Sequence, residues 1–146
     1  MGKKKIVNKG STGKNNALKA RVLAKSSQKK KKIESGILNV QSTYNNTRVS
    51  LTDTDGNLFF SSSSGSLGFR GAKKGTPFAA AKVAEVVAEM SQNAGLKSIH
   101  VVVKGVGAGR ESAIRTFVSK GFEILSIKDV TPVPHNGPRM RKARRV

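Results

Sequence analysis

Hydrophobic and polar positions in the first half of the chain predict three strands. Residues 37–43 indicate one strand, and residues 48–52 alternate with the period of two that is typical of a half-buried strand. Tyr44–Asn46 predicts a turn between these strands. Asp55-Gly56 is a strong hairpin signal before a third strand over residues 58–62. We therefore expect an antiparallel meander of three strands.

The next segment predicts a loop and then a helix. Residues 61–75 contain four consecutive serines, four glycines and several cations, which is typical of a flexible loop. Thr76 and Pro77 indicate a helix start, with Thr76 as the N-cap and Pro77 where its missing N–H group costs nothing. Gly95 marks the expected end of this helix. Its apolar face consists of Val83, Val86, Val87 and Met90.

Residues 99–130 predict a strand, a second helix and a final strand. The run at residues 99–104 indicates a strand that is buried on both faces for part of its length. A glycine-rich turn over residues 105–111 leads into the second helix, which should end at Gly121, and residues 123–130 predict the last strand. The expected apolar stripe of the second helix is Ile114, Phe117 and Val118.

This order of elements predicts an α/β fold. Strands that alternate with helices imply right-handed crossovers and parallel pairing, whereas the first half pairs antiparallel. We expect a mixed five-stranded sheet with two main helices, an order that ribonuclease-H-like folds share. The expected parts are a basic flexible N-terminal extension (residues 1–35), the α/β domain (36–130), and a proline-rich neck with a basic tail (131–146).

Two loops of this fold should lie at one edge of the sheet. Ligands gather at the carboxyl ends of parallel strands, where both the glycine-rich turn and the neck begin. We therefore expect the neck to start at the same edge as the glycine-rich turn, and the turn and the tail to be neighbours.

Charge is concentrated at the two ends of the chain. The formal net charge is +20, and of the 28 Lys and Arg residues twelve lie in residues 1–32 and five in residues 139–146, where there is no acid. Basic arms on a nearly balanced globule favour a protein embedded in nucleic acid over a metabolic enzyme. We expect residues 1–32 to be disordered alone and to order on a partner. A transit peptide is the alternative, although eleven Lys to one Arg favour a binding arm.

The C-terminal segment from Thr131 divides into a neck, a turn and a tail. Its prolines at positions 132, 134 and 138 exclude a helix, so the neck should stand off the domain. Asn136-Gly137 predicts a tight turn. The cations of the last eight residues would repel one another unless a polyanion neutralised them. This end therefore predicts a contact with a polyanion.

The glycine-rich turn has two explanations. The spacing of Gly105, Gly107 and Gly109 matches neither a dinucleotide-binding motif nor a P-loop. Glycines would let the backbone approach a phosphate beside the free N–H groups of a helix start, with Lys104 and Arg110 on either side. Alternatively, the glycines only permit a tight strand-to-helix turn, and both explanations can hold together.

Residues 64–75 combine glycines, cations and one aromatic ring. This combination suits a loop that follows an RNA backbone, with Phe69 available to stack on a base. A position of Phe69 in the core is equally compatible with the sequence. The cations Arg70, Lys73 and Lys74 favour contact with phosphates.

Other classes of function are disfavoured. The chain has no cysteine, and only Asp129 of its eight acids is expected at a strand end near the glycine-rich turn, too few for a two-metal nuclease. We expect no enzymatic activity, no cofactor, no metal, no small-molecule substrate and no membrane span. The competing function is a nucleoid-like protein that coats nucleic acid without preference. Such a protein would not need two glycine-rich cationic loops at one sheet edge.

Four sequence blocks, in order, resemble small-subunit ribosomal protein eleven, a universal family, in its bacterial or organellar type. They are Tyr44-Asn45-Asn46-Thr47, a block from Gly68 to Ala80, a block from Lys104 to Arg115, and a block from Asp129 to Gly137, and the resemblance covers residues 36–146. The resemblance implies a ribonuclease-H-like fold without catalytic acids. The implied function is structural: binding small-subunit ribosomal RNA in the platform, near the mRNA exit and the E site, and so supporting translation. Neighbouring platform proteins and nearby mRNA would be its other partners.

The resemblance and the loops together define the expected RNA-binding residues. These are Asn45, Asn46, Phe69, Arg70, Lys73, Lys74, Lys104, Gly105, Gly107, Gly109, Arg110, Arg115, His135, Asn136, Arg139, Arg141, Lys142, Arg144 and Arg145.

Some positions depart from the bacterial pattern of the family. Val106 and Ala108 stand where prolines are usual, and Pro138-Arg139-Met140 replaces a Cys-Arg-Pro-Pro run. The sequence therefore does not distinguish between a ribosome of the bacterial cytoplasm, of a mitochondrion and of a plastid. Asn136 is also a candidate for isoaspartate formation, because Gly137 does not hinder succinimide closure, and the resemblance suggests the same modification.

Overall fold

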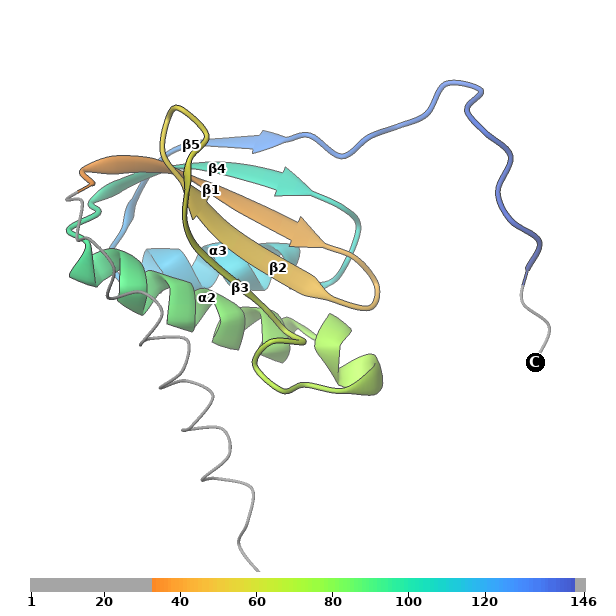
Figure 1. Ribbon diagram of the computed structural model, residues 1–146, viewed down its shortest axis with the longest axis horizontal. Coiled ribbons are helices and arrows are strands. Elements are labelled where there is room, and N and C mark those ends of the chain that lie inside the picture. The colour runs from red at the N-terminus through yellow and green to blue at the C-terminus, as the bar shows by residue number, and fades with distance from the viewer. Residues whose placement is uncertain (1–32, 144–146) are drawn as a thin grey trace, which may run out of the picture.

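The fold is a mixed five-stranded sheet with two main helices, as predicted (Figure 1). A computed structural model describes residues 33–143. The elements in chain order are β1 (Ser35–Ser42), β2 (Thr47–Thr52), β3 (Leu58–Ser63), the short 3-10 helix η1 (Gly71–Gly75), α2 (Pro77–Asn93), β4 (Ser98–Lys104), α3 (Gly109–Ser119) and β5 (Glu123–Asp129). The expectations for residues 1–32, and those for Arg144 and Arg145, lie outside the described residues.

The strands lie in the order β3-β2-β1-β4-β5. The pairs β1–β2 and β2–β3 are antiparallel, and β1–β4 and β4–β5 are parallel. The antiparallel half therefore comes from the two hairpins, and the parallel half comes from crossovers through α2 and α3. The parallel strands β1, β4 and β5 all end at the same edge, which places the loops that follow them together.

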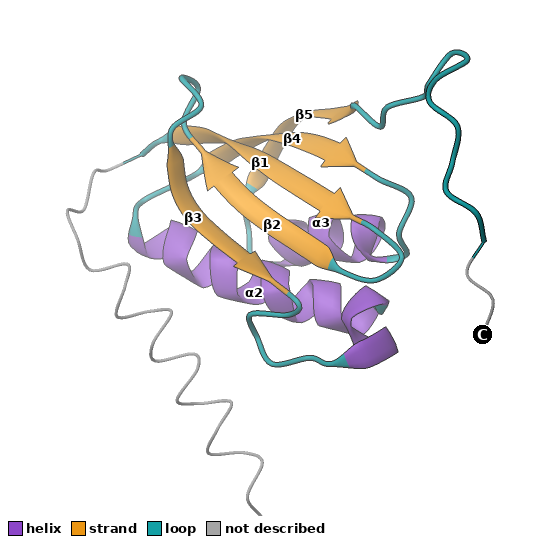
Figure 2. Cartoon of the chain, turned by 45° about the vertical axis from the view of Figure 1, so that its right-hand side comes forward, coloured by secondary structure: helices purple, strands orange, loops and turns teal. Residues whose placement is uncertain are grey.

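Both helices cover the same face of the sheet (Figure 2). The core lies between this face and the helices. Its fully buried side chains include Leu38, Val40, Val49, Leu51, Val83, Val87, Ile99, Val101 and Phe117. Burial of each such side chain stabilises the fold by about 1.5–3 kcal/mol, which makes this single core the main source of stability.

Two burial predictions are wrong. The prediction for β4 fails because the helices cover only one face of the sheet, and the prediction for α3 fails because of where Val118 lies around the helix. In β4, Ile99, Val101 and Val103 are buried, but His100 and Val102 on the opposite face are only half-buried. In α3 the buried side chains are Ala113 and Phe117, with Ile114 packed against the core, whereas Val118 is 55% exposed. The next position after Phe117 turns about 100° away from the sheet, so it leaves the buried stripe.

The local signals for helix ends and turns are confirmed. Thr76 caps α2, and its hydroxyl accepts a hydrogen bond from the backbone N–H of Ala79. Gly95 and Gly121 follow α2 and α3 in the left-handed conformation, with φ of 86° and 85°. Gly56 has a φ of 87° in the β2–β3 hairpin.

The segment predicted as a flexible loop is largely structured. The strand β3 continues to Ser63, and residues 71–75 form η1. The serines stabilise the turn between these elements: the Ser66 hydroxyl accepts from the N–H of Ser63 at 2.9 Å and donates to its carbonyl at 2.7 Å. Short hydroxyl side chains bond to nearby backbone groups in this way, so a run of serines does not imply mobility.

Within residues 33–143, no helix is both long enough and apolar enough to span a membrane.

Candidate nucleic-acid interface

Three loops meet at one end of the sheet: the β1–β2 turn, the segment of η1, and the glycine-rich turn after β4 (Figure 2). Their backbones are in direct contact. The N–H of Gly107 donates to the carbonyl of Ser42 at 3.0 Å, and a Cβ on Gly75 would lie only 2.0 Å from the carbonyl oxygen of Tyr44. We call this end of the molecule the loop end.

The three glycines of the turn face the protein's own chain. A Cβ on Gly105 would lie 2.1 Å from the Ser42 carbonyl oxygen, and one on Gly107 would lie 2.3 Å from the Thr43 carbonyl oxygen. A Cβ on Gly109 would lie 2.5 Å from the Thr47 hydroxyl oxygen. Of the two explanations for these glycines, close packing in a strand-to-helix turn therefore has direct support. Contact between this turn and a phosphate stays a prediction.

A buried polar cluster lies beneath the loop end. The hydroxyl groups of Ser42 and Thr47 are 3.2 Å apart, and the N–H of Ser64 donates to the Thr47 carbonyl at 2.9 Å. These three residues are fully buried. The cluster ties the β1–β2 hairpin to the chain that follows β3, so the loop end has a defined shape before it meets a partner.

The two asparagines of the β1–β2 turn have different surroundings. The side-chain oxygen of Asn46 accepts a hydrogen bond from the N–H of Gly65 at 3.3 Å, and Asn46 is half-buried. Asn45 is exposed. Asn46 thus has a structural role in the turn, whereas Asn45 is free to contact a partner.

Four cations of the loop end are available to bind anions. Arg70, Lys73 and Lys104 are exposed and Lys74 is half-buried. Within residues 33–143, none of them forms an ion pair. These side chains carry uncompensated positive charge close to the turns described above.

Arg115 lies beside an open groove of about 510 Å³ that runs along α3. Its guanidinium is paired with Glu111 at 3.1 Å, one turn away on the same helix. Both side chains are about 80% exposed, so the pair is weak, and Arg115 is easily released to another anion. The groove is lined by Pro77, Ala108, Glu111, Ser112, Arg115, Thr116 and Ser119.

Phe69 is not a core residue. It is half-buried and lies edge-to-face against Phe78, with ring centroids 6.2 Å apart. Phe78 is 64% exposed and was not among the predicted site residues. A signal for its exposure is present in the sequence, because Phe78 lies outside the apolar stripe of α2 and a helix residue in that position faces outward.

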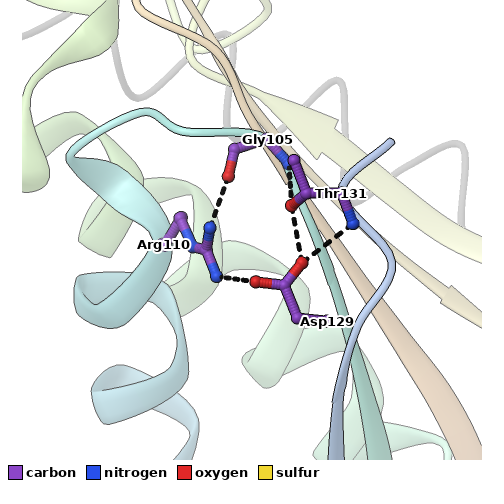
Figure 3. Close-up of polar contacts among 4 residues, drawn as sticks. All are labelled: Gly105, Arg110, Asp129 and Thr131. Carbon is purple, nitrogen blue, oxygen red and sulfur yellow. Dashed lines mark hydrogen bonds and ion pairs between the residues drawn. The ribbon is translucent and has the colours of Figure 1, made fainter. Parts of the chain in front are cut away.

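A cluster around Asp129 joins the glycine-rich turn to the neck (Figure 3). One carboxylate oxygen of Asp129 accepts from the N–H of Thr131 at 2.8 Å and from its hydroxyl at 2.5 Å. The other carboxylate oxygen pairs with the guanidinium of Arg110. The ring of contacts is closed by Gly105, whose N–H donates to the Thr131 hydroxyl at 3.1 Å and whose carbonyl accepts from Arg110 at 2.7 Å.

We call this arrangement the Asp129 cluster. It confirms that the neck starts beside the glycine-rich turn, whereas the described part of the tail, residues 139–143, lies away from the turn because the neck leads the chain off the domain (Figure 1). It also assigns to Arg110 a role in holding the neck, because two of its nitrogens are already bonded within the protein.

The Asp129 cluster should open only in strong acid. The hydroxyl of Thr131, its N–H group and Arg110 all stabilise the carboxylate, and they lower the pKa of Asp129 from 3.8 to about 2. Because the folded-state pKa is depressed, the stabilisation is complete above pH 3.8 and is lost as the pH falls through about 2. We expect the amide resonance of Thr131 to shift with a midpoint near that lower pH in an NMR titration. Asp129→Asn should abolish the transition, and a midpoint near 4 would contradict the bonding described here.

The chain stands off the domain after Thr131, as predicted (Figure 1). Residues 132–143 are all exposed, and they include His135, Asn136, Arg139, Arg141 and Lys142. Asn136 has a φ of 53° and is the one described non-glycine residue in the left-handed region. Its isoaspartate formation stays a prediction.

No three His, Asp or Glu side chains within residues 33–143 gather as a metal site would require.

The fold and its charge distribution are those of a ribonucleoprotein component. A small α/β domain carries cationic turns at one end, and an exposed basic segment extends away from the domain after the neck (Figure 1). The family model described as Ribosomal protein S11 matches residues 36–145, and the chain belongs to this family. It is therefore a structural, ribosomal RNA-binding component of the small ribosomal subunit, which confirms the resemblance found in the sequence.

Proposed function

We propose that this chain holds ribosomal RNA helices in place in the platform of the small subunit, near the mRNA exit and the E site. The observation that carries the proposal is the convergence of three turns and the neck at the loop end. Neighbouring platform proteins and mRNA are the other partners in this proposal. Membership of the family supports this location.

In this proposal the cations of the loop end provide affinity for RNA, and its backbone turns provide the shape that makes binding specific. Exposed cations, such as Arg70, Lys73 and Lys104, contact phosphates, and the basic tail adds further phosphate contacts. The backbone turns supply the shape that fits a folded RNA, since the deep groove of an A-form helix offers little for side chains to read. Arg110 acts mainly by positioning the neck through the Asp129 cluster.

Directed cleavage of the RNA tests whether the loop end faces the platform RNA. Since the chain has no cysteine, Lys73→Cys and Leu58→Cys each create one site for an iron chelate that generates hydroxyl radicals. Lys73 lies at the loop end. Leu58 is the first residue of β3 and lies next to the β2–β3 turn, at the end of the sheet opposite to the loop end. In small subunits carrying each variant, we expect cleavage from position 73 at platform nucleotides, and weaker cleavage or cleavage elsewhere from position 58.

Sedimentation of a gently lysed extract is the companion measurement. Comigration of the chain with the small subunit through a moderate salt wash supports the proposal. A chain found with DNA, or cleavage from position 73 outside the platform, would instead favour the nucleoid-like alternative or another location in the subunit.

A further inference from the structure

The loop end presents an aromatic ring that no core contact explains. Phe78 follows Pro77 in the first turn of α2 and is 64% exposed. Phe69 meets it edge-to-face, with an angle of 84° between the ring planes. Phe69 is half-buried, and its backbone N–H donates to the carbonyl of Ser64 at 3.2 Å, so it supports the exposed ring from one side.

The chain segment that carries this ring is cationic. Residues 56–84 contain no acid, whereas Arg70, Lys73, Lys74 and Lys82 lie in this stretch. The ammonium group of Lys82 is 5.8 Å from the centroid of Phe78 and also pairs with Glu85 at 2.9 Å. Arg70, directly after Phe69 in the chain, has no acidic partner among the described residues.

This charge distribution selects the kind of ligand. An apolar protein surface would bury Arg70, Lys73 and Lys74 without compensation, which is costly. An unpaired nucleotide satisfies both features, because its base has a flat π face for the ring and its phosphates lie within reach of cations. The contact with Phe69 also restricts the ring before binding, which reduces the conformational entropy lost on stacking.

We propose that Phe78 is the stacking site for an unpaired base of ribosomal RNA, with Phe69 as its support. This inference rests on the proposed function of the loop end. It replaces the sequence-based expectation that Phe69 itself stacks on a base. The ligand is an unstacked nucleotide, such as one in a loop or bulge, rather than a base within a helix.

Salt-dependent binding of the full chain to a transcript of the platform RNA tests the stacking site. Phe78→Leu removes the π face but keeps an apolar side chain, and we expect the Kd to rise about 5- to 30-fold. The slope of log Kd against log salt should stay unchanged, because no phosphate contact is lost. Phe78→Trp, which keeps an aromatic face at this position, should bind as tightly as the unmodified chain. By contrast, Arg70→Gln should reduce the slope by about 1.

Leu58→Ala is the matched control, because Leu58 is an apolar residue of similar exposure (61%) at the other end of the β2–β3 hairpin. It should leave the Kd unchanged. If Phe78→Leu binds like the unmodified chain, or loses affinity with a reduced salt slope, the stacking inference is overturned while the proposed function stands. If the unmodified chain itself prefers the platform transcript no more than unrelated RNA, the proposed function fails first.

A photo-reactive benzoylphenylalanine at position 78 in assembled small subunits gives a second readout. A crosslink to ribosomal RNA supports the stacking site. A crosslink to protein alone overturns it.

Discussion

A chain truncated after Gly137 will bind ribosomal RNA about two to three orders of magnitude more weakly than the full chain at about 0.15 M salt. The truncation removes Arg139, Arg141, Lys142, Arg144 and Arg145. Each cation that contacts a phosphate releases about 0.7–0.9 counterions, so the five together account for a large share of the electrostatic affinity. Filter binding across a salt series will show both the loss and a salt slope that is smaller by about 4.

A full-length chain with these five residues replaced by Gln separates charge from chain length. It should behave like the truncated chain, and both should lose affinity equally for platform RNA and unrelated RNA. Arg70→Gln, on the structured loop end, should weaken platform RNA preferentially. A truncated chain that keeps its affinity for unrelated RNA would show that the tail recognises a particular structure rather than phosphate charge.

Gly107→Ala will destabilise the fold by about 1–3 kcal/mol and will also weaken RNA binding. The added methyl group would lie 2.3 Å from the carbonyl oxygen of Thr43 and 2.4 Å from the hydroxyl oxygen of Ser42. The glycine-rich turn must therefore move away from the β1–β2 turn, and the hydrogen bond from Gly107 to Ser42 is lost. Urea denaturation with the platform RNA binding assay alongside will measure both effects.

Gly65→Ala is the control for this substitution. A Cβ on Gly65 has its nearest neighbour at 3.9 Å, in the flexible side chain of Lys74, and Gly65 does not have a positive φ. We expect it to change the free energy of unfolding by less than about 0.5 kcal/mol. Equal losses for Gly107→Ala and Gly65→Ala would mean that close packing of the turn is not what the glycine at position 107 provides.

The elements that short-range signals specify could be predicted from the sequence. Thr76-Pro77 determines where α2 begins, and Asp55-Gly56 determines the β2–β3 hairpin, because caps and turns depend on a few adjacent residues. The parallel half of the sheet followed from the alternation of strands and helices. This topology was also enough to predict that the neck and the glycine-rich turn would be neighbours.

The features that depend on tertiary packing were missed. The pairing of Arg110 with Asp129 joins residues from two elements, and no local pattern marks either one as the partner of the other. The sequence does not show that one face of the sheet lacks helices, because an apolar residue such as Val102 is also expected in a strand that is buried on both faces. The serine run predicts a flexible loop, but in the folded chain its hydroxyl groups form hydrogen bonds with the local backbone. Phe78 differs from these, because the hydrophobic periodicity of α2 marks its buried stripe and Phe78 lies outside that stripe.

If the loop end and the tail both bind ribosomal RNA, as proposed above, the Asp129 cluster makes them a bivalent ligand. It fixes the base of the neck against the glycine-rich turn, and the prolines at positions 132, 134 and 138 restrict the conformations of the chain beyond it. Once the loop end has docked, the tail searches for phosphates only within the reach of a short, stiff tether, at a high effective concentration. In that case the chain would leave the RNA only when both contacts are released together, and we expect a residence time longer than either contact would give alone.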